Sequence, residues 1–311
     1  MITFFTTGKP FRGHDGIIQR NALKSWTLVD PDVEVILFGD DEGAAQVSAD
    51  LGLRHEPHVE RHESGTKYVN YLFKRASEIA RHKLLCFANC DIILMSDFAN
   101  GAAVARSWRD QFLLVAKRWD TDVVEPIDFH HPSWAHDLRE FARTKGFRQD
   151  EYWIDLFLFP KGLYTDMPPL IVGHCYWDNW MIWKALSTKT PVLDASSFVM
   201  PIHQNHGYNP KFGRIKGVAS DALSAHNLQV MGGAGHVRQL DSATYRITSS
   251  GRVRVSFARY KSWCSHALLK LWKVLYYRIW RTVWHSVLDA TRPLRSLVGL
   301  RSKSVRERQR S

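Results

Sequence analysis

The segment "CFANCDIILMSDF", residues 86–98, has the pattern of a buried strand that two polar residues interrupt. Apolar residues lie on both sides of the interruption, and Asn89 and Asp91 stand inside it. A carboxylate is costly to bury unless it has a partner or a function. The segment therefore predicts a strand that places chemistry at its carboxyl end.

Strand and helix patterns alternate on both sides of this segment. Helical spacing of apolar residues occurs at 16–29, 40–52, 67–82, 134–146 and 177–187. Strand patterns occur at 2–7, 33–39, 83–93, 112–120, 152–160 and the start of 191–209. This alternation predicts an α/β fold with a mostly parallel central sheet flanked by helices. Ligands of such sheets bind at the carboxyl ends of the strands, where Asn89 and Asp91 are expected.

The composition is that of a folded protein. The chain has 311 residues, of which 45% are hydrophobic and 23% charged, so it can build a sizeable core. No apolar stretch reaches the length of about 18 residues that predicts a transmembrane helix. The first residues, "MITFFTTGKPFRG", lack a basic region before the apolar run and read as a first strand, not a signal peptide. We therefore expect a cytoplasmic protein.

The net charge of +11 is unevenly distributed. Residues 252–311 hold 15 Lys and Arg against 2 acids, whereas residues 1–251 hold 27 against 29. We predict a catalytic domain over 1–250 and a basic tail over 251–311 whose end is disordered. Residues 263–288 have the pattern of a basic amphipathic helix that is rich in Trp and Tyr. This combination is typical of helices that bind the surface of an anionic membrane. The residues expected at that surface are Lys270, Trp272, Lys273, Arg278, Trp280 and Arg281.

Two alternatives exist for this tail. It could pack on the catalytic domain, or it could bind nucleic acid. The nearly neutral body and the position of the aromatic residues on the apolar side of the helix argue against nucleic acid.

Several residues are candidates for a site on their own chemistry. Asn89 and Asp91 would supply the hard oxygen ligands that hold a divalent cation beside a diphosphate, although a strand-end Asp can also cap a turn. Asp178 could take a proton from an acceptor hydroxyl or serve as a helix cap. Its aromatic surroundings should raise its pKa, and the helix N-terminus should lower it. Trp177 and Trp180 fit a sugar-stacking wall as well as core packing.

Three further segments give weaker indications of a functional site. His203 and His206 stand three residues apart, which suits a nitrogen ligand but is also common on surfaces. Asp155 is an acid inside an apolar strand and needs a partner or a function. "TTGKPFRG" lacks the pattern of a P-loop, but Thr6, Thr7 and backbone amides there could contact a nucleotide.

The order of these segments carries a resemblance. "QRNALKSW", "FGDDEG", "SGTKYVNYLF", "FANCDIIL", "WIDLFLFP", "WDNWMIW" and "HQNHGY" together resemble nucleotide-sugar glycosyltransferases of the GT-A fold, and more narrowly a GT-A-like group with N-x-D and WDNW segments. The resemblance covers residues 1–250. It implies a Mn²⁺ or Mg²⁺ ion and a nucleotide-diphosphate sugar, of UDP or GDP type, as donor. Asn89 replaces the first acid of the usual D-x-D motif.

The resemblance also implies roles by position. Asp91 with Asn89 matches the metal motif, and His203 matches the late histidine that completes it, with His206 as the rival. Asp178 matches the catalytic base, and Asp155 is a second catalytic candidate. Residues expected on the donor side are Thr6, Thr7, Arg20, Asp40, Asp41, Lys67 and Asn89, and those on the acceptor side are Trp177 and Trp180.

Together these features predict a metal-assisted glycosyltransferase at the cytosolic face of a membrane. Its acceptor would be a hydroxyl of a glycan or lipid-linked sugar, as in polysaccharide biosynthesis, and nucleic acid is not an expected partner. The alternatives are a nucleotidyltransferase on the same fold and a non-catalytic protein that binds nucleotide sugars or membranes.

Overall fold

The computed structural model describes residues 1–206, 221–258, 272, 275–277 and 279–280. The chain divides into two units, and the first of them spans Met1–Arg259. The predicted boundary at residue 250 stays a prediction. Most of the predicted amphipathic helix, including Lys270, Lys273, Arg278 and Arg281, lies outside the described residues. The described residues of that segment are helical.

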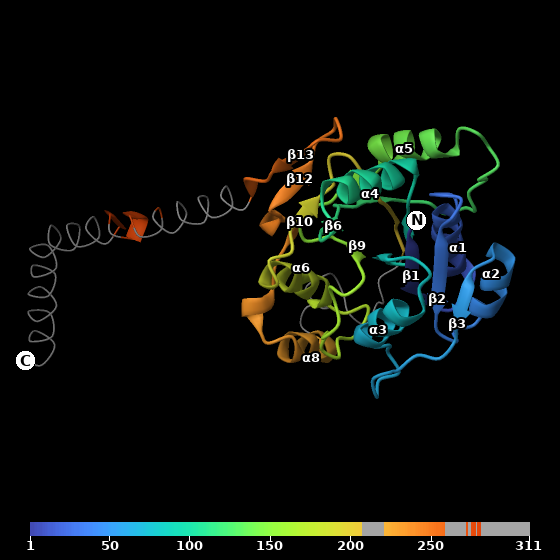
Figure 1. The fold of residues 1–311 in the computed structure, drawn as a ribbon, viewed down its shortest axis with the longest axis horizontal. Helices are drawn as coiled ribbons and strands as arrows, with labels where there is room; N and C mark the ends of the chain where they lie inside the picture. Colours follow the sequence, from blue (N-terminus) through green and yellow to red (C-terminus); the bar gives the residue numbers. More distant parts are fainter. Residues whose placement is uncertain (207–220, 259–271, 273–274, 278, 281–311) are drawn as a thin grey trace, which may run out of the picture. The chain divides into compact units, whose positions relative to one another are not determined.

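A large mixed sheet forms the centre of the first unit (Figure 1). Its strand order is β13-β12-β10-β6-β9-β4-β1-β2-β3. Strands β9 and β13 run antiparallel to their neighbours, and the other neighbouring strands are parallel. The strands are β1 (Thr3–Thr7), β2 (Glu34–Phe38), β3 (Arg54–Glu56), β4 (Leu84–Ala88), β6 (Leu113–Val115), β9 (Leu156–Pro160), β10 (Val192–Asp194), β12 (Tyr245–Ile247) and β13 (Val253–Val255).

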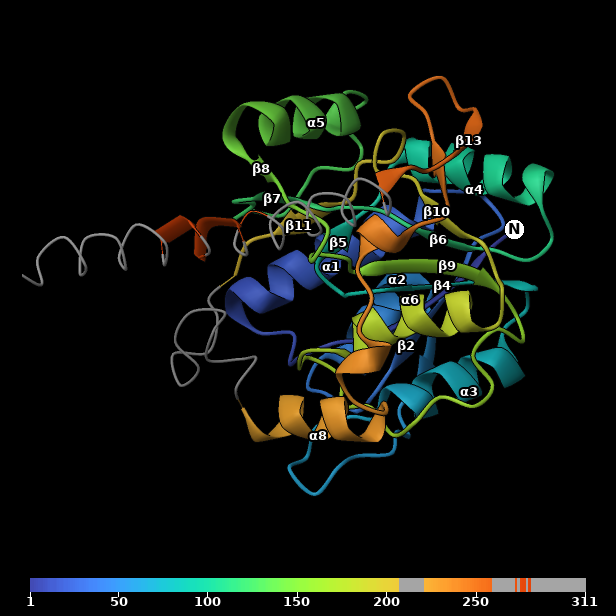
Figure 2. The same ribbon diagram turned by 90° about the vertical axis from the view of Figure 1, so that its left-hand side faces the viewer.

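Helices cover both faces of this sheet, as the alternating sequence pattern predicts (Figures 1 and 2). The helices of the first unit are α1 (Gly13–Thr27), α2 (Ala44–Leu51), α3 (Val69–Ile79), α4 (Ser96–Trp108), α5 (Trp134–Lys145), α6 (Trp177–Ser187), α8 (Ala222–Val230), and the short 3₁₀ helices η2 (Ala234–His236) and η3 (Leu240–Ser242). Successive side chains of a strand point to opposite faces of the sheet, so neighbouring residues of β1 pack in different hydrophobic clusters. Phe4 packs with α1 and α4, whereas Phe5 packs with α3. The predicted α/β fold with helices on a mostly parallel sheet is confirmed.

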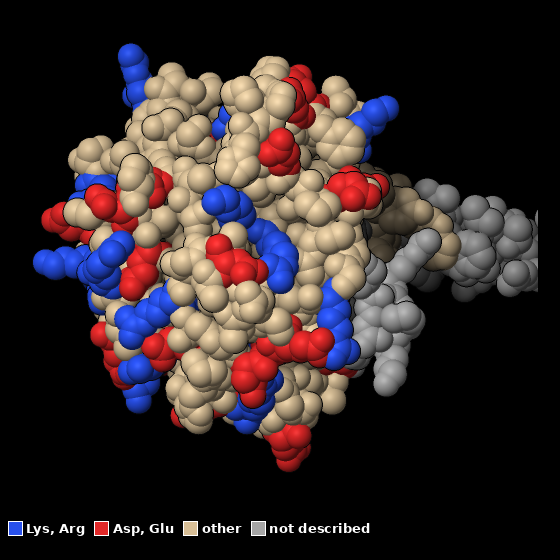
Figure 3. All heavy atoms as spheres, turned by 90° about the vertical axis from the view of Figure 1, so that its right-hand side faces the viewer, with Lys and Arg blue, Asp and Glu red and all other residues tan. Residues whose placement is uncertain are grey.

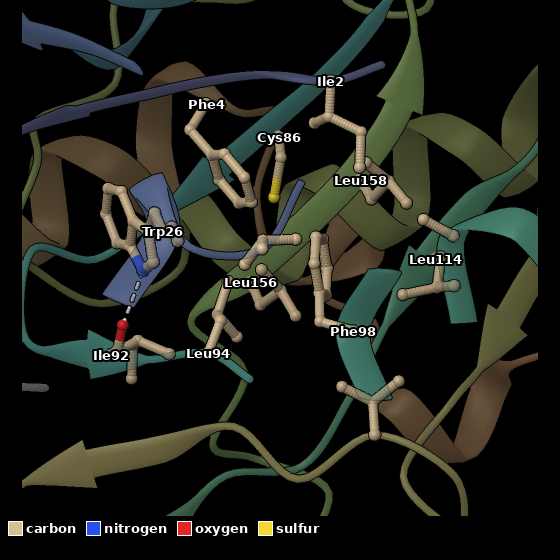
Figure 4. Packing of buried hydrophobic residues seen from close by; sticks show 14 of the residues in the cluster. Ile2, Phe4, Trp26, Cys86, Ile92, Leu94, Phe98, Leu114, Leu156 and Leu158 are labelled. Carbon is tan, nitrogen blue, oxygen red and sulfur yellow. Dashed lines mark hydrogen bonds between the residues drawn. The ribbon is translucent and has the colours of Figure 1, made fainter. Parts of the chain in front are cut away.

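The core on the α1 side also fixes the interrupted segment (Figure 4). The indole N–H of Trp26 donates a hydrogen bond to the backbone oxygen of Ile92 at 2.8 Å. Phe4 stacks on Trp26 with ring centroids 5.4 Å apart. A buried Trp normally satisfies its single N–H in this way. The backbone that follows Asp91 is therefore held rigidly against α1.

A second, four-stranded sheet accounts for the main errors in the predicted strands. It has the order β5-β11-β7-β8 and contains β5 (Ile92–Ile93), β7 (Trp119–Thr121), β8 (Phe147–Arg148) and β11 (Ile202–Gln204). The predictions of single strands at 83–93 and 112–120 are wrong, because each stretch leaves the large sheet and enters the small one. Helices α4 and α8 and the hairpin of β12 and β13 were not predicted. No helix of the described residues combines the length and the hydropathy needed to cross a bilayer.

Candidate active site

Asp91 lies in the break between β4, a strand of the large sheet, and β5, a strand of the small sheet. The backbone N–H of Ile92 donates to the oxygen of Asn89 at 3.1 Å, which closes the turn between the strands. The side-chain amide of Gln204 and its backbone N–H both donate to the backbone oxygen of Asp91, at 3.1 and 3.2 Å. The interruption in the sequence is therefore the point where the chain passes from one sheet to the other.

Three possible ligands converge at this point. Asp91, His203 and His206 each offer one ligand atom, and these atoms lie within 4.8 Å of one another. Oδ2 of Asp91 lies 3.1 Å from Nε2 of His206 and 3.7 Å from Nε2 of His203. The prediction treated the two histidines as alternatives, but the structure brings both to the same carboxylate.

The fit of this cluster to a cation can be tested on its own atoms. Oδ1 of Asp91 is buried and accepts no hydrogen bond from the described residues. Nδ1 of His203 lies 3.3 Å from a carboxylate oxygen of Asp120, and its Nε2 faces Asp91. A carboxylate behind the far nitrogen of an imidazole is the usual support of a metal-binding histidine. A buried carboxylate oxygen and an oriented imidazole suit a divalent ion.

The electrostatics of the cluster favour an ionised Asp91. Burial alone would raise its pKa, but the charges of His203, His206 and Arg118 outweigh it and hold the pKa at about 2. Burial likewise opposes a charge on His203, yet Asp91 and Asp120 raise the pKa of that imidazole. The carboxylate is thus ready to act as a ligand across the physiological pH range.

A buried arginine, which sequence reasoning missed, links this cluster to a second carboxylate. Arg118 is 5% exposed and lies between β6 and β7. Its guanidinium is 2.6 Å from Asp155 and 2.7 Å from Asp120, and it stacks over Trp153 at 4.6 Å from the ring centroid. Burial would lower its pKa, but Asp155 and Asp120 raise it above the ordinary value. Arg118 therefore stays charged at all relevant pH values.

Asp155 has partners on both carboxylate oxygens. Its Oδ1 accepts the side-chain amide N–H of Asn89 at 2.6 Å, and its Oδ2 faces Arg118. The backbone N–H of Asn89 also donates to the backbone oxygen of Asp155 at 3.0 Å. The need of this partly buried acid for a partner is thus met. A catalytic role of Asp155, and the roles of Asn89 as metal ligand and donor contact, stay predictions.

Asp178 has the properties of a proton acceptor. It lies in the first turn of α6, just after the N-cap residue Tyr176, which has a φ of 83° that side-chain-bearing residues seldom adopt. Burial and the charge of Asp155 raise its pKa, while hydrogen bonds from backbone N–H groups and the charge of Arg118 lower it, and the result is about 7. Of the two predicted effects on the pKa of Asp178, the increase caused by burial is therefore larger than the decrease caused by the helix N-terminus.

The two tryptophans beside Asp178 lie in the apolar core. Trp177 and Trp180 are 5% and 3% exposed. Trp177 packs edge-on against Phe87, with ring centroids 5.3 Å apart. This position agrees with the alternative that both residues pack in the core, and it leaves little ring surface on which a sugar could stack. An acceptor contact by either residue stays a prediction, and the low exposure of the rings does not support it.

The strand ends next to β4 bring the predicted donor-side residues together. The ammonium group of buried Lys67 donates to the backbone oxygen of Gly8 at 2.7 Å and also pairs with Asp41. Burial lowers the pKa of Lys67, although Asp41 opposes the shift. The hydroxyl of Thr7 donates to the backbone oxygen of Phe38 at 2.9 Å. Strands β4, β1 and β2 are parallel neighbours, so their carboxyl ends meet at one edge.

Other predicted donor residues have different surroundings. Thr6 is buried, and its hydroxyl is directed to the backbone oxygen of Thr7 at 3.4 Å. Asp40 is exposed and pairs with Arg61. Arg20 pairs with Asp50 of α2 at 3.2 Å. Acidic and basic side chains are interspersed over one face of the molecule (Figure 3). Arg20 thus forms part of a surface pair between α1 and α2, and its predicted donor contact stays a prediction.

Comparisons with known proteins give a remote likeness. A scan against protein-family models and a search of curated protein sequences find no match for this chain. Among solved structures, the chain is similar to glucosyl-3-phosphoglycerate synthase from Mycobacterium tuberculosis in complex with Mg²⁺ and UDP, at 9% identity over 83% of this chain and 90% of that chain, with a TM-score of 0.46. It is also similar to TarS 1-349 of S. aureus in complex with UDP-GlcNAc, at 13% identity over 74% and 70%, with a TM-score of 0.44.

A further match shows how partial this likeness is. A TarS structure in complex with UDP is matched over 39% of this chain and 36% of that chain, at 15% identity and a TM-score of 0.31. These TM-scores are low, and the likeness therefore adds no weight to an assignment of function.

Proposed function

We propose that this protein transfers a sugar from a nucleoside-diphosphate donor to a hydroxyl group of a glycan or lipid-linked acceptor. The observation that carries the proposal is the cluster of Asp91, His203 and His206 at the strand-end edge, in the same unit as Asp178, a partly buried carboxylate with a pKa of about 7. A ligand set for a cation and a separate proton acceptor are the two functions that glycosyl transfer needs.

Asp91, His203 and His206 would hold the divalent cation. Such an ion, when bound, neutralises charge on the departing nucleoside diphosphate. Mg²⁺ prefers oxygen ligands, whereas a set with two imidazoles suits Mn²⁺ better. We therefore expect Mn²⁺ to support binding more strongly than Mg²⁺.

The remaining steps belong to the residues of the chain. Asp178, when ionised, takes the proton of the acceptor hydroxyl as that oxygen attacks the anomeric carbon and the bond to the diphosphate breaks. Arg118 holds Asp155 and Asp120 in place, and Asp120 in turn orients His203. Lys67, held between Gly8 and Asp41, places a cation near the donor edge.

A thermal-shift panel tests the donor site. UDP, GDP, CDP, ADP and dTDP are each added with and without Mn²⁺ to the wild type, Asp91→Ala and the surface control Asp110→Ala. A ligand at about 100 times its dissociation constant stabilises by about 2.7 kcal/mol, a visible shift. UDP and GDP are the first candidates, because the resemblance in sequence implies a donor of one of these types. Stabilisation should require Mn²⁺ and vanish only in Asp91→Ala. No response to any nucleotide would contradict the proposal.

Membrane attachment through the tail is a separate proposal. Six described residues of the predicted amphipathic helix at 263–288 are large, apolar or aromatic and exposed, and Trp272, Tyr277 and Ile279 are the most exposed of these at 61%, 71% and 63%. Trp and Tyr favour the membrane interface, and the net positive charge of residues 252–311 favours anionic lipid. This attachment would place the enzyme at the cytosolic face of a membrane, close to a lipid-linked acceptor.

Vesicle sedimentation tests this attachment. The protein should pellet with phosphatidylglycerol vesicles, should bind phosphatidylcholine vesicles weakly, and should be released by high salt. The double variant Trp272→Ser, Trp280→Ser should lose binding while its nucleotide response is kept. Equal binding of the variant and the wild type would remove these residues from the membrane contact.

A further inference from the structure

The small sheet separates two environments. Along β7, Asp120 pairs in register with His203, and Trp119 pairs with Ile202. Successive side chains of a strand point to opposite faces, so Trp119 and Ile202 face away from the metal-ligand cluster. Ile202 packs in one cluster with apolar residues of α5, which lies over β7 and β8 in Figure 2. The α5 side is thus the reverse side of the sheet that carries His203.

A cavity of about 760 Å³ lies on this reverse side, and three arginines line it. Arg139 and Arg143 stand four residues apart on α5 and therefore share a face of that helix. Arg148 of β8 pairs in register with Trp119, which also lines the cavity. Asp97 is the only acid among the described lining residues, so the arginines leave a net positive charge.

The charges of these arginines are only partly satisfied within the chain. Arg139 lies 3.2 Å from Asp97, whose other oxygen accepts the backbone N–H of Met200 at 2.9 Å. Arg148 donates to a backbone oxygen, which carries no full charge. Arg143 pairs with Glu140 at 2.8 Å, but both side chains are about half exposed, and such pairs contribute little. A bound anion would therefore meet available guanidinium groups.

The rest of the lining suits a carbohydrate. Trp119 and Phe198 offer apolar aromatic surface, on which the C–H face of a sugar ring can pack. Asn100, Ser197 and Ser249 are exposed and offer amide and hydroxyl groups to sugar hydroxyls. A lining of aromatic rings and hydroxyl groups alone would fit a neutral sugar, and a lining of arginines alone would fit any anion. This cavity has both, which together fit a sugar that carries negative charge.

We propose that this cavity binds an anionic saccharide, one that carries carboxylate or phosphate groups, at a site separate from the Asp91 cluster. Arginine binds both groups through paired N–H donors, which explains three guanidinium groups in one cavity. The role of the site, to hold a distant segment of the acceptor chain, rests on the proposed function. Binding itself needs neither donor nor transfer and can be measured alone.

Calorimetric titration of the full chain tests this site. The probes are tetragalacturonate as the carboxylate form, a glycerol phosphate tetramer as the phosphate form, maltotetraose as the neutral form, and a DNA tetranucleotide as a non-saccharide anion. The variants are Arg143→Gln, and Lys145→Gln as a matched control, because Lys145 is an exposed base of α5 that does not line the cavity. Asp91→Ala serves as the control for the metal-ligand cluster.

One anionic saccharide should bind, with affinity that falls at least about fivefold in Arg143→Gln and stays unchanged in Lys145→Gln and Asp91→Ala. Maltotetraose should bind more weakly than either charged tetramer. No binding of either charged saccharide, equal loss in Lys145→Gln, loss only in Asp91→Ala, or tighter binding of the tetranucleotide would each overturn the proposal. A failed nucleotide panel with intact saccharide binding would instead overturn glycosyl transfer alone.

Discussion

Asp178→Asn should make the protein more stable and at the same time inactive. The substitution replaces a partly buried carboxylate by an amide of the same shape, whose oxygen can still accept the backbone N–H of Asn179. The wild-type carboxyl has a pKa of about 7 when folded and an ordinary value of 3.8. The native state therefore binds more protons than the unfolded state between these values, and the free energy of unfolding falls as pH rises through this window.

The magnitude follows from the two pKa values. Each pH unit inside the window costs the wild type about 1.4 kcal/mol, and the loss ends above the folded-state pKa. The amide does not titrate, so the variant avoids this loss. The difference in unfolding free energy between Asp178→Asn and the wild type should thus grow by about 3 kcal/mol between about pH 4.5 and about pH 8. Other substituent effects are independent of pH and cancel in this comparison.

Urea unfolding of both proteins at these two pH values measures the difference, and sugar transfer is measured in parallel. Turnover of the variant should fall by about 10²–10⁴-fold, while nucleotide binding survives because Asp178 is not among the expected ligands of the donor. A stability difference that is the same at both pH values would show that Asp178 has an ordinary pKa in the folded protein. That result would refute the account of its burial.

Three further predictions concern Asp178, Arg118 and Gly39. Wild-type transfer should rise with pH up to about 7 and then level, because Asp178 must be ionised to accept a proton; a rate that is flat over this range would contradict the role. Arg118→Gln should destabilise by about 3–5 kcal/mol in urea unfolding, since it removes the cation that pairs with the partly buried carboxylates of Asp155 and Asp120. Arg143→Gln should change stability by less than about 1 kcal/mol, because Arg143 is exposed. Gly39→Ala should cost about 1–3 kcal/mol, because Gly39 has a φ of 107° and an added Cβ would lie 2.7 Å from Oδ2 of Asp41; an unchanged unfolding midpoint would contradict this.

The local pattern of apolar residues was enough to predict those helices in which the pattern is regular over several turns. Helices α1, α3, α5 and α6 lie within two or three residues of their predicted bounds, because apolar spacing and turn residues are encoded locally. The need of Asp91 for a partner was also visible in the sequence, since a carboxylate inside an apolar run needs a partner or a function wherever the strand lies in the fold, and the structure places His203 and His206 beside it. For Asp178 the sequence named the two opposing effects on its pKa but not which of them prevails, because the extent of burial depends on the tertiary fold.

The missed residues depend on contacts between distant strands. Arg118 and Asp120 stand in "AKRWD", which reads as the end of one continuous strand. Their role arises because β7 leaves the large sheet and pairs with β11, which sets Asp120 beside His203. Register between strands that are about 80 residues apart is not a local property. The only sequence signal was an Arg and an Asp two residues apart after an apolar run.

Charge balance explains why these residues belong together. Asp91, Asp120 and Asp155 are three carboxylates within one connected set of contacts, and Arg118 is the only permanent cation among them. Imidazoles must be neutral to bind a metal ion, and with both histidines in that form the three carboxylates and one guanidinium carry a net charge of −2, which is costly to shield from water. A divalent cation at Asp91 removes it in one step. Arg118, which pairs with Asp155 and Asp120, therefore also limits the excess negative charge of the cluster to two. A divalent cation balances this charge, and a monovalent cation does not.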